Sequence, residues 1–510
     1  MSPKRLLPLV VILIVLGVLA VLLKRAPVPT QLAEEVGLEH LVPQTLGVDS
    51  IRGFDLYHGA HPQDIVRVRQ RDGVWVVPSR FEAPGNNTKI QQFLTQFSTL
   101  QGELRADSTA LLGDFRLTDE QALHLKVYTD APDQLAFYLL VGKGSGVNSF
   151  VRRAGEGRVY SVNLNLYNTV GLSSGTTDQV PTAKPWLDLH LQNVPKEQVT
   201  AVELHAPARE LRFITQPTAA SGSAEASQTS STLPSAPAWQ LVSPALTYSV
   251  KQDAVEGLVT TLRTLQGDDV ADPARVAEYG LDTPPYRATL TLQPSGQEAR
   301  QVAVLIGNAV PEKSGSRYAR LGDTGPVYVV PEWTWQRLFP TLGTLLDLHL
   351  LQVSQEEVTS LALQHDGASW SLERRPAEAS TAPPTASGTT ESASTWQLVG
   401  APEAQVDASA VTSLLGTTTQ LNADDLPIGT SSQTGLDRPT LTLALTLRDG
   451  RTERLVLGQA VGQESSGYYA SRGDTAEVFI VSSSTYKILT DAAAKLKPAS
   501  ASTAKAPTQP

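Results

Sequence analysis

Apolar residues recur at the spacing of one helix face at three places along the chain. In each place they occupy positions i, i+3, i+4, i+7 and i+10, which predicts an amphipathic helix with one buried stripe. Asn87, Asp253 and Asp407 stand near the expected starts, where a short polar side chain can cap the first turn. The predicted stripes, with Thr418 as the one polar member, are Ile90, Phe93, Leu94, Phe97 and Leu100; Val255, Leu258, Val259, Leu262 and Leu265; and Val411, Leu414, Leu415, Thr418 and Leu421.

Strand patterns surround each of these helices. Trp75, Trp239 and Trp396 precede the helices in short apolar and polar runs that predict strands with one buried face. After the third helix, strict alternation over residues 441–447 leads to an Asp-Gly dipeptide at 449–450, which is a strong hairpin signal. Antiparallel hairpins with helices on one face predict an α+β fold.

Shared motifs indicate that the chain holds three copies of one unit. Leu-Asp-Leu-His-Leu at residues 187–191 recurs at 346–350, and a Val-Thr pair follows eight residues later in both places. Val48 begins the matching segment of the first copy, which puts Ile51 in register with Val202 and Leu361.

Two turns repeat as well, and together the motifs set the predicted domains. Gly-Leu-Asp-x-Pro at 280–284 recurs at 435–439 and decays to Asp-Phe-Arg-Leu at 114–117, while Gly155, Gly322 and Gly473 mark a later turn. We expect a linker over residues 26–47 and three domains. These are repeat 1 (48–191), repeat 2 (192–350) and repeat 3 (351–497).

Low-complexity sequence interrupts repeats 2 and 3 at the same place. Residues 216–237 and 376–394 consist mainly of Ser, Thr, Ala and Pro, and each insert lies between an early strand and the tryptophan strand. Such a composition buries too little apolar surface to order itself. We expect disordered inserts there and a disordered tail over residues 498–510.

An apolar run near the amino terminus predicts a membrane anchor. Leu6 to Leu23 is an uncharged 18-residue stretch flanked by Lys and Arg on both sides. As a helix it covers about 27 Å, close to the roughly 30 Å of a bilayer core. Residues 1–25 are therefore expected to form a single-pass helix that places the large C-terminal part outside the cytoplasm. A cleaved signal peptide and a cytosol-facing chain are the alternatives.

Composition narrows the function classes. The chain has 510 residues, no cysteine and a net charge of −10. The missing cysteines exclude disulfides, thiolate metal sites and cysteine nucleophiles. The acidic balance provides no basic footprint for nucleic acid, so no nucleic-acid partner is expected.

With these motifs assembled, the chain resembles the bacterial family catalogued as domain of unknown function 4340. Repeat 2 carries the family's Trp-x-Leu-x-x-Pro pattern at 239–244, its Tyr-Gly-Leu-Asp-x-Pro turn at 279–284 and the end of its hairpin at 304–307. The resemblance implies an N-terminal membrane helix and a role beside ABC-type transporters of the gliding-motility auxiliary kind. It brings no catalytic residues with it.

Several short motifs carry possible chemistry, but each has a plainer structural explanation. Gly-Leu-Ser-Ser-Gly at 171–175 has the nucleophile-elbow spacing but is followed by loop-like sequence. Gly142 aligns with Gly307 and Gly458 at the end of a hairpin strand, so Gly-Lys-Gly-Ser-Gly at 142–146 is not expected to bind phosphate. His58 and His61 form the only close histidine pair and lack the third ligand that zinc needs.

The remaining candidates are two repeated histidines, an Arg-Gly-Asp tripeptide and two carboxylate pairs, and each has a structural explanation. His190 and His349 occupy matched positions, which indicates one structural role used twice, with a duplicated binding role as the alternative. Arg-Gly-Asp at 472–474 lies in a turn whose tripeptide does not repeat. The carboxylate pairs at 424–425 and 356–357 are expected to be solvated.

These observations favour a non-enzymatic, membrane-anchored protein whose repeated domains bind a partner such as an ABC-type transporter or an envelope assembly. A cell-envelope hydrolase working near Ser173 or His58 and His61 is one alternative, and a passive spacer is another. No catalytic, cofactor-binding or metal-binding residue is assigned.

Overall fold

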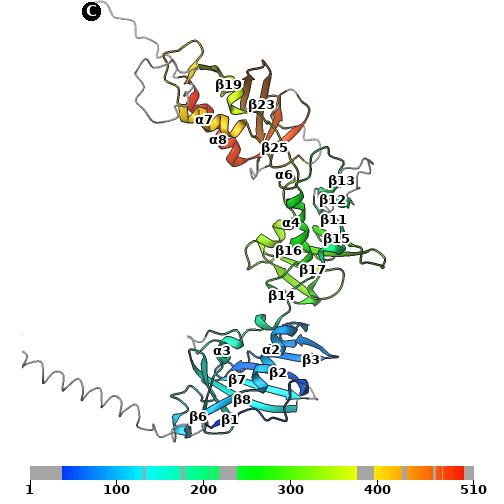
Figure 1. Ribbon diagram of the computed structural model, residues 1–510, viewed down its shortest axis with the longest axis vertical. Coiled ribbons are helices and arrows are strands. Elements are labelled where there is room, and N and C mark those ends of the chain that lie inside the picture. Colours follow the sequence, from blue (N-terminus) through cyan, green and yellow to red (C-terminus); the bar gives the residue numbers. More distant parts are fainter. Residues whose placement is uncertain are drawn as a thin grey trace, which may run out of the picture. The chain divides into compact units, whose positions relative to one another are not determined.

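The structure is a computed structural model (Figure 1). It describes residues 37–129, 134–173, 178–207, 209–216, 238–375, 395–427, 433–462, 467–473 and 475–498. Their strands form three antiparallel sheets of ten, eight and seven strands. They group into two compact units, Met1–Leu189 with Asp269–Ala274, and His190–Asp268 with Arg275–Pro510.

The first sheet begins earlier than the residue with which sequence comparison starts repeat 1. Its strand order is β1-β6-β10-β9-β8-β7-β2-β3-β4-β5, and the accompanying helices are α2 (Asn87–Ser98) and α3 (Leu166–Thr169). The strands are β1 (Leu38–His40), β2 (Ile51–His58), β3 (Val66–Arg71), β4 (Val74–Val77), β5 (Ala83–Pro84), β6 (Gln101–Asp107), β7 (Leu123–Thr129), β8 (Gln134–Ser145), β9 (Asn148–Arg153) and β10 (Arg158–Val162).

The second sheet has the order β13-β12-β11-β15-β16-β17-β18-β14. Its strands are β11 (Val199–Ala206), β12 (Arg209–Gln216), β13 (Ala238–Ser243), β14 (Asp269–Ala271), β15 (Tyr286–Leu292), β16 (Arg300–Ala309), β17 (Arg317–Leu321) and β18 (Val327–Val330). Its helices are α4 (Gln252–Arg263), α5 (Glu332–Leu338) and α6 (Leu342–Leu345).

The third sheet has the order β21-β20-β19-β22-β23-β24-β25, and helices α7 (Ala408–Thr418) and α8 (Ser483–Leu496) pack on each other beside it (Figure 1). Its strands are β19 (Val358–His365), β20 (Ala368–Arg375), β21 (Thr395–Leu398), β22 (Leu441–Leu447), β23 (Thr452–Ala460), β24 (Gly467–Arg472) and β25 (Val478–Ser482).

The three helical stripes predicted from the sequence are confirmed. α2, α4 and α7 bury the first four positions of each stripe, including the polar Thr418. The fifth position of each stripe, Leu100, Leu265 or Leu421, is buried as well but lies just after the helix ends. Of the expected caps, only Asp407 is correct, and its carboxylate accepts from the N–H groups of Ser409 and Ala410. Asn86 caps α2 in place of Asn87, and α4 begins after Lys251 with no side-chain cap.

The repeated turns are also confirmed, and they explain three matched glycines. Gly280 and Gly435 take φ values of +66° and +69°, and Arg116 holds φ +53° at the matching place in repeat 1. A Cβ at Gly307 would overlap the carbonyl oxygen of Tyr279 in this turn, and the same crowding occurs at Gly142 and Gly458. A hairpin strand therefore passes directly over the turn in each copy.

The alignment of the first copy is wrong by three residues. The strands β2, β11 and β19 each show a register shift at their first residue. At that point Ile51 lies opposite Thr129, Val199 opposite Leu292 and Val358 opposite Leu447. Ile51 thus corresponds to Val199 and Val358. The sequence comparison had aligned Ile51 with Val202 and Leu361, which are apolar residues three positions after its true counterparts.

The predicted fold class needs correction. An α+β fold led by a transmembrane helix was expected, whereas the regular structure of the described residues is mostly antiparallel strand, with less helix. The helical pattern is conspicuous in the sequence, but among the described residues each copy has one or two helices of eleven residues or more against seven or more strands. Within the described residues no helix is long and apolar enough to cross a membrane, and the predicted anchor at Leu6–Leu23 lies outside them.

Candidate functional site

Alternation along the strands of the second sheet gives it one apolar face and one polar face. Val202 and Leu290 point into the core, where α4 packs against β13 and β15. Glu203 and His205 on β11 point to the opposite side, which we call the outer face. Because directly opposed residues of neighbouring strands share a face, Arg287 on β15 joins them there.

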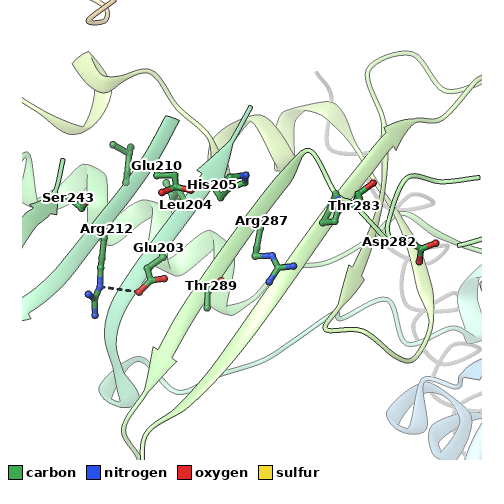
Figure 2. A pocket seen from close by; sticks show the side chains of 12 residues that line it. Glu203, Leu204, His205, Glu210, Arg212, Ser243, Asp282, Thr283, Arg287 and Thr289 are labelled. Atoms are coloured by element: carbon green, nitrogen blue, oxygen red, sulfur yellow. Dashed lines mark hydrogen bonds and ion pairs between the residues drawn. The ribbon is translucent and has the colours of Figure 1, made fainter. Parts of the chain in front are cut away.

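The outer face of repeat 2 contains a hollow of about 750 Å³ (Figure 2). Its lining combines charged residues from β11, β12 and β15 with the turn after Leu281. Two contacts order this lining. Arg212 Nε lies 3.0 Å from Glu203 Oε1, and His205 Nδ1 lies 2.8 Å from Glu210 Oε1.

Two charged groups of the hollow are not used by these pairs. Arg287 stands between the β11 side chains and the turn that carries Asp282 (Figure 2). Both side chains are exposed, and neither makes a hydrogen bond or ion pair within the described part of the chain. A free guanidinium can bind a carboxylate or phosphate in two-pronged fashion, and a free carboxylate can bind a cation.

The corresponding outer face of repeat 1 is filled by an internal network. Tyr57 and His124 take the places of His205 and Arg287, as the strand registers show. Their rings stack with centroids 4.6 Å apart. The Tyr138 hydroxyl bridges them, 2.9 Å from the Tyr57 hydroxyl and 2.5 Å from His124 Nδ1.

The partners of His124 determine its tautomer. Its Nε2 lies 2.6 Å from the Asp119 carbonyl oxygen, which can only accept, so Nε2 carries the proton. Nδ1 therefore accepts from Tyr138 in the neutral ring. Burial lowers the pKa of His124 and raises the pKa of Tyr138, so both groups stay neutral near pH 7.

A second buried cluster lies on the same face of repeat 1. Asp55 pairs with Arg69 at 2.7 Å and accepts from the Tyr128 hydroxyl at 2.9 Å, and both charged side chains are about one-tenth exposed. A Cβ at Gly53 would lie 2.6 Å from the Arg69 side chain. Glycine there lets the arginine fold across the strand.

Repeat 3 has a third composition at these positions. Gln364 and Thr442 replace the histidine and arginine, and Ala362 replaces Glu203. The three copies thus share one sheet but present three chemically different outer faces. Sequence comparison missed this because it followed the apolar positions that repeat.

Within the described residues, neither Ser173 nor the His58 and His61 pair lies in the arrangement that a nucleophile elbow or a zinc site requires. Gly171 follows α3 without a preceding strand, and Ser173 is exposed, with its N–H bonded to the Gln179 side chain at 2.9 Å. The rest of that motif, residues 174–175, lies outside the described residues. His58 is buried in β2, while His61 is exposed beside Asp64. No group of three metal-ligating side chains occurs among the described residues.

The repeated histidines have the same structural contact. His349 Nδ1 lies 2.6 Å from Asn422 Oδ1, and His190 contacts the matching Gln266. His40, which the sequence comparison missed, lies 3.0 Å from Gln101 and belongs to the same series. The His-Leu dipeptide at 40–41 was the available signal.

The remaining candidates from the sequence are the Arg-Gly-Asp tripeptide and the two carboxylate pairs. Arg472 pairs with Glu453 at 3.0 Å, and Asp474 lies outside the described residues. Of the 424–425 pair, Asp424 is exposed, as predicted, and accepts from the Ser482 N–H, whereas Asp425 is only partly exposed and pairs with Arg209 at 2.7 Å. Both residues of the pair at 356–357 are exposed.

The fold defines a tandem antiparallel-sheet protein whose second copy has a hollowed, polar outer face. The chain belongs to the family described as a domain of unknown function (DUF4340), which matches residues 75–236, 239–395 and 396–497 and so covers more than half of the chain in three tandem copies. No curated protein matches, and no solved structure matches.

Proposed function

We propose that the chain is a binding scaffold whose outer faces recognise a protein partner, with the repeat 2 hollow as the principal contact. The observation that supports this proposal most directly is which charged side chains of the hollow are paired and which are not. Among the described residues, Arg287 and Asp282 have no hydrogen-bond or ion-pair partner and lie beside two ordered charge pairs. A partner segment carrying one acidic and one basic side chain would satisfy both groups.

The chemistry of the hollow supports binding over catalysis. The histidine of the hollow contacts Glu210, and Ser243, which also lines it, receives no bond from that ring in the described residues. A serine nucleophile needs an adjacent base, and His205 is directed elsewhere. The difference between the three outer faces also supports recognition, because a passive spacer has no need for copy-specific chemistry.

Site-specific photo-crosslinking in the native host tests the proposal. A photoreactive side chain at position 287 of the full chain is expected to capture one defined protein. The same probe at the exposed Arg300, on the neighbouring strand and outside the hollow lining, serves as the control. Because the family resemblance implies ABC-type transporters as partners, a transporter subunit is the first product to look for.

A charge reversal makes the test specific. Arg287→Glu is expected to lower capture from a probe at position 283 at least about tenfold, while Arg300→Glu leaves it unchanged. Equal capture from positions 287 and 300, or equal effects of the two reversals, would contradict recognition through this hollow.

A further inference from the structure

The backbone at the matched tryptophans has a different hydrogen-bond partner in repeats 1 and 2. In repeat 1, β5 pairs with β4, and the Gly85 N–H donates to the Trp75 carbonyl at 2.7 Å. In repeat 2, β13 is the edge strand, and the Gln252 side chain takes the place of a further strand. Its Nε2 donates to the Trp239 carbonyl at 2.9 Å, and its Oε1 accepts from the Trp239 N–H at 2.6 Å.

A second side chain of α4 completes this cover in repeat 2. Glu256 lies one turn after Gln252, and its Oε2 accepts from the Trp239 indole N–H at 3.1 Å. Lys196 balances the carboxylate, with its Nζ 2.6 Å from Oε1. The main chain and the indole of Trp239 are therefore both paired.

Repeat 3 lacks both of these side chains. The buried stripes of α4 and α7 put Ala408 at the place of Gln252 and Thr412 at the place of Glu256. The methyl group of alanine cannot bond to a backbone. The Thr412 hydroxyl donates to the Ala408 carbonyl of its own helix at 2.9 Å.

The backbone of β21 is consequently open at the edge of the third sheet. β21 is the last strand, and the residue after it, Val399, donates its N–H to the Ser371 carbonyl of β20 at 2.9 Å. Because bonded pairs alternate along an antiparallel ladder, the N–H and carbonyl of Trp396 and the N–H of Leu398 point away from β20. Within the described part of the chain, neither these three groups nor the Trp396 indole N–H has a hydrogen-bond partner.

We propose that this edge of repeat 3 binds an extended segment of a partner protein, which joins the sheet as an antiparallel strand beside β21. The open groups at Trp396 and Leu398 have the two-residue spacing that another extended backbone matches. The orientation follows β5, which lies antiparallel on the strand that carries Trp75. This site is separate from the repeat 2 hollow and belongs to a different sheet.

The surroundings of the edge specify the chemistry of the occupant. Its residue opposite Trp396 shares the face of the sheet on which α7 packs, where an acceptor can bind the open indole N–H. Gln355 stands at the place of Lys196, so the cation that balances the carboxylate in repeat 2 is missing here. Asp407, which caps α7, is an acid directly before Ala408. A neutral amide, glutamine or asparagine, is therefore the acceptor that fits this edge.

A synthetic peptide tests the site on the full chain. The probe is the end-blocked heptapeptide Thr-Val-Thr-Gln-Thr-Val-Thr with a fluorescent label, whose alternation places both valines and the glutamine on one face. We expect saturable binding of one peptide per chain, measured by fluorescence anisotropy. N-methylation of the glutamine removes the N–H that would donate to the Trp396 carbonyl, and it should weaken binding at least about tenfold. The same methyl group on the following threonine, whose N–H points away from β21, is the control.

Side chains of α7 provide the matched variants of the protein. Ala408→Gln with Thr412→Glu installs the side chains that cover the edge in repeat 2, and both positions are exposed and accept these good helix formers. We expect this double variant to weaken peptide binding at least about tenfold. Ser413→Glu, at another exposed position of α7, should leave binding unchanged.

The other outcomes overturn the proposal. The absence of saturable binding would do so, as would equal weakening by the two methylated peptides or by the two sets of α7 substitutions. A dimer of the full chain that the double variant dissociates would assign the edge to a second molecule of the protein.

Discussion

At the scale of single residues, the buried ring of His124 makes repeat 1 sensitive to acid. Burial lowers its pKa below the ordinary value of 6.5, so the unfolded chain binds this proton more readily than the folded chain does. Stability is therefore full above about pH 6.5 and falls as the pH drops through that value towards the lower folded pKa. Protonation would also place a proton on Nδ1, which accepts from Tyr138.

The prediction is measured as the melting temperature of the full chain between pH 5 and pH 8. We expect His124→Gln to flatten the acid slope of the repeat 1 transition, while His61→Gln, at an exposed position, leaves the slope as it was. A slope that survives His124→Gln would contradict the assignment.

Two glycine substitutions, one expected to lower and one to raise the free energy of unfolding, test the crowded turn. Gly307→Ala is expected to destabilise repeat 2 by about 1–3 kcal/mol, because a Cβ would overlap the Tyr279 carbonyl oxygen. Gly257→Ala is the matched control, since Gly257 lies inside α4 with no atom near its absent Cβ. Alanine there should stabilise by about 1 kcal/mol through helix propensity. Denaturant unfolding measures both values.

At the scale of elements, the periodicity of the sequence predicted the helices and the hairpin, whereas strand register and the composition of the outer faces depend on pairing between strands. The stripe of α2 and the hairpin at Asp449-Gly450 follow from local spacing, and both are confirmed. The start of β2 does not follow from local spacing, because its register shift depends on pairing with β7. The outer faces were equally beyond prediction, since the Tyr57–His124 contact joins strands that are distant in sequence.

The tryptophan strands allow a graded prediction. Trp75 and Trp239 are 4% and 6% exposed, whereas Trp396 is only partly buried. Trp239→Ala should cost about 3–5 kcal/mol as a large-to-small core change, and Trp396→Ala should cost less. Calorimetry of the full chain distinguishes the two, and equal losses would contradict the difference in burial.

At the scale of the whole molecule, one ion pair ties repeat 2 to repeat 3 within the second unit. Arg209 and Asp425 are 17% and 19% exposed, and the same carboxylate accepts from the Leu342 N–H. Asp425→Asn should weaken this junction by about 1.5–3 kcal/mol, because it removes the charge that strengthens both bonds. We expect the unfolding of repeats 2 and 3 to separate into two transitions. Asp437→Asn, at an exposed turn position, should leave them joined.

The boundaries of the family match bear on how this gene can be divided for expression. The match over 239–395 begins within β13 and ends at the start of β21. A fragment with those ends would lose β11 and β12, leaving β15 with a bare edge, and would carry the β19–β20 pair without its neighbours β21 and β22. Such edges promote aggregation. Cutting between the sheets instead, as in a fragment over residues 192–350, keeps β11 to β13 together with β15 to β18.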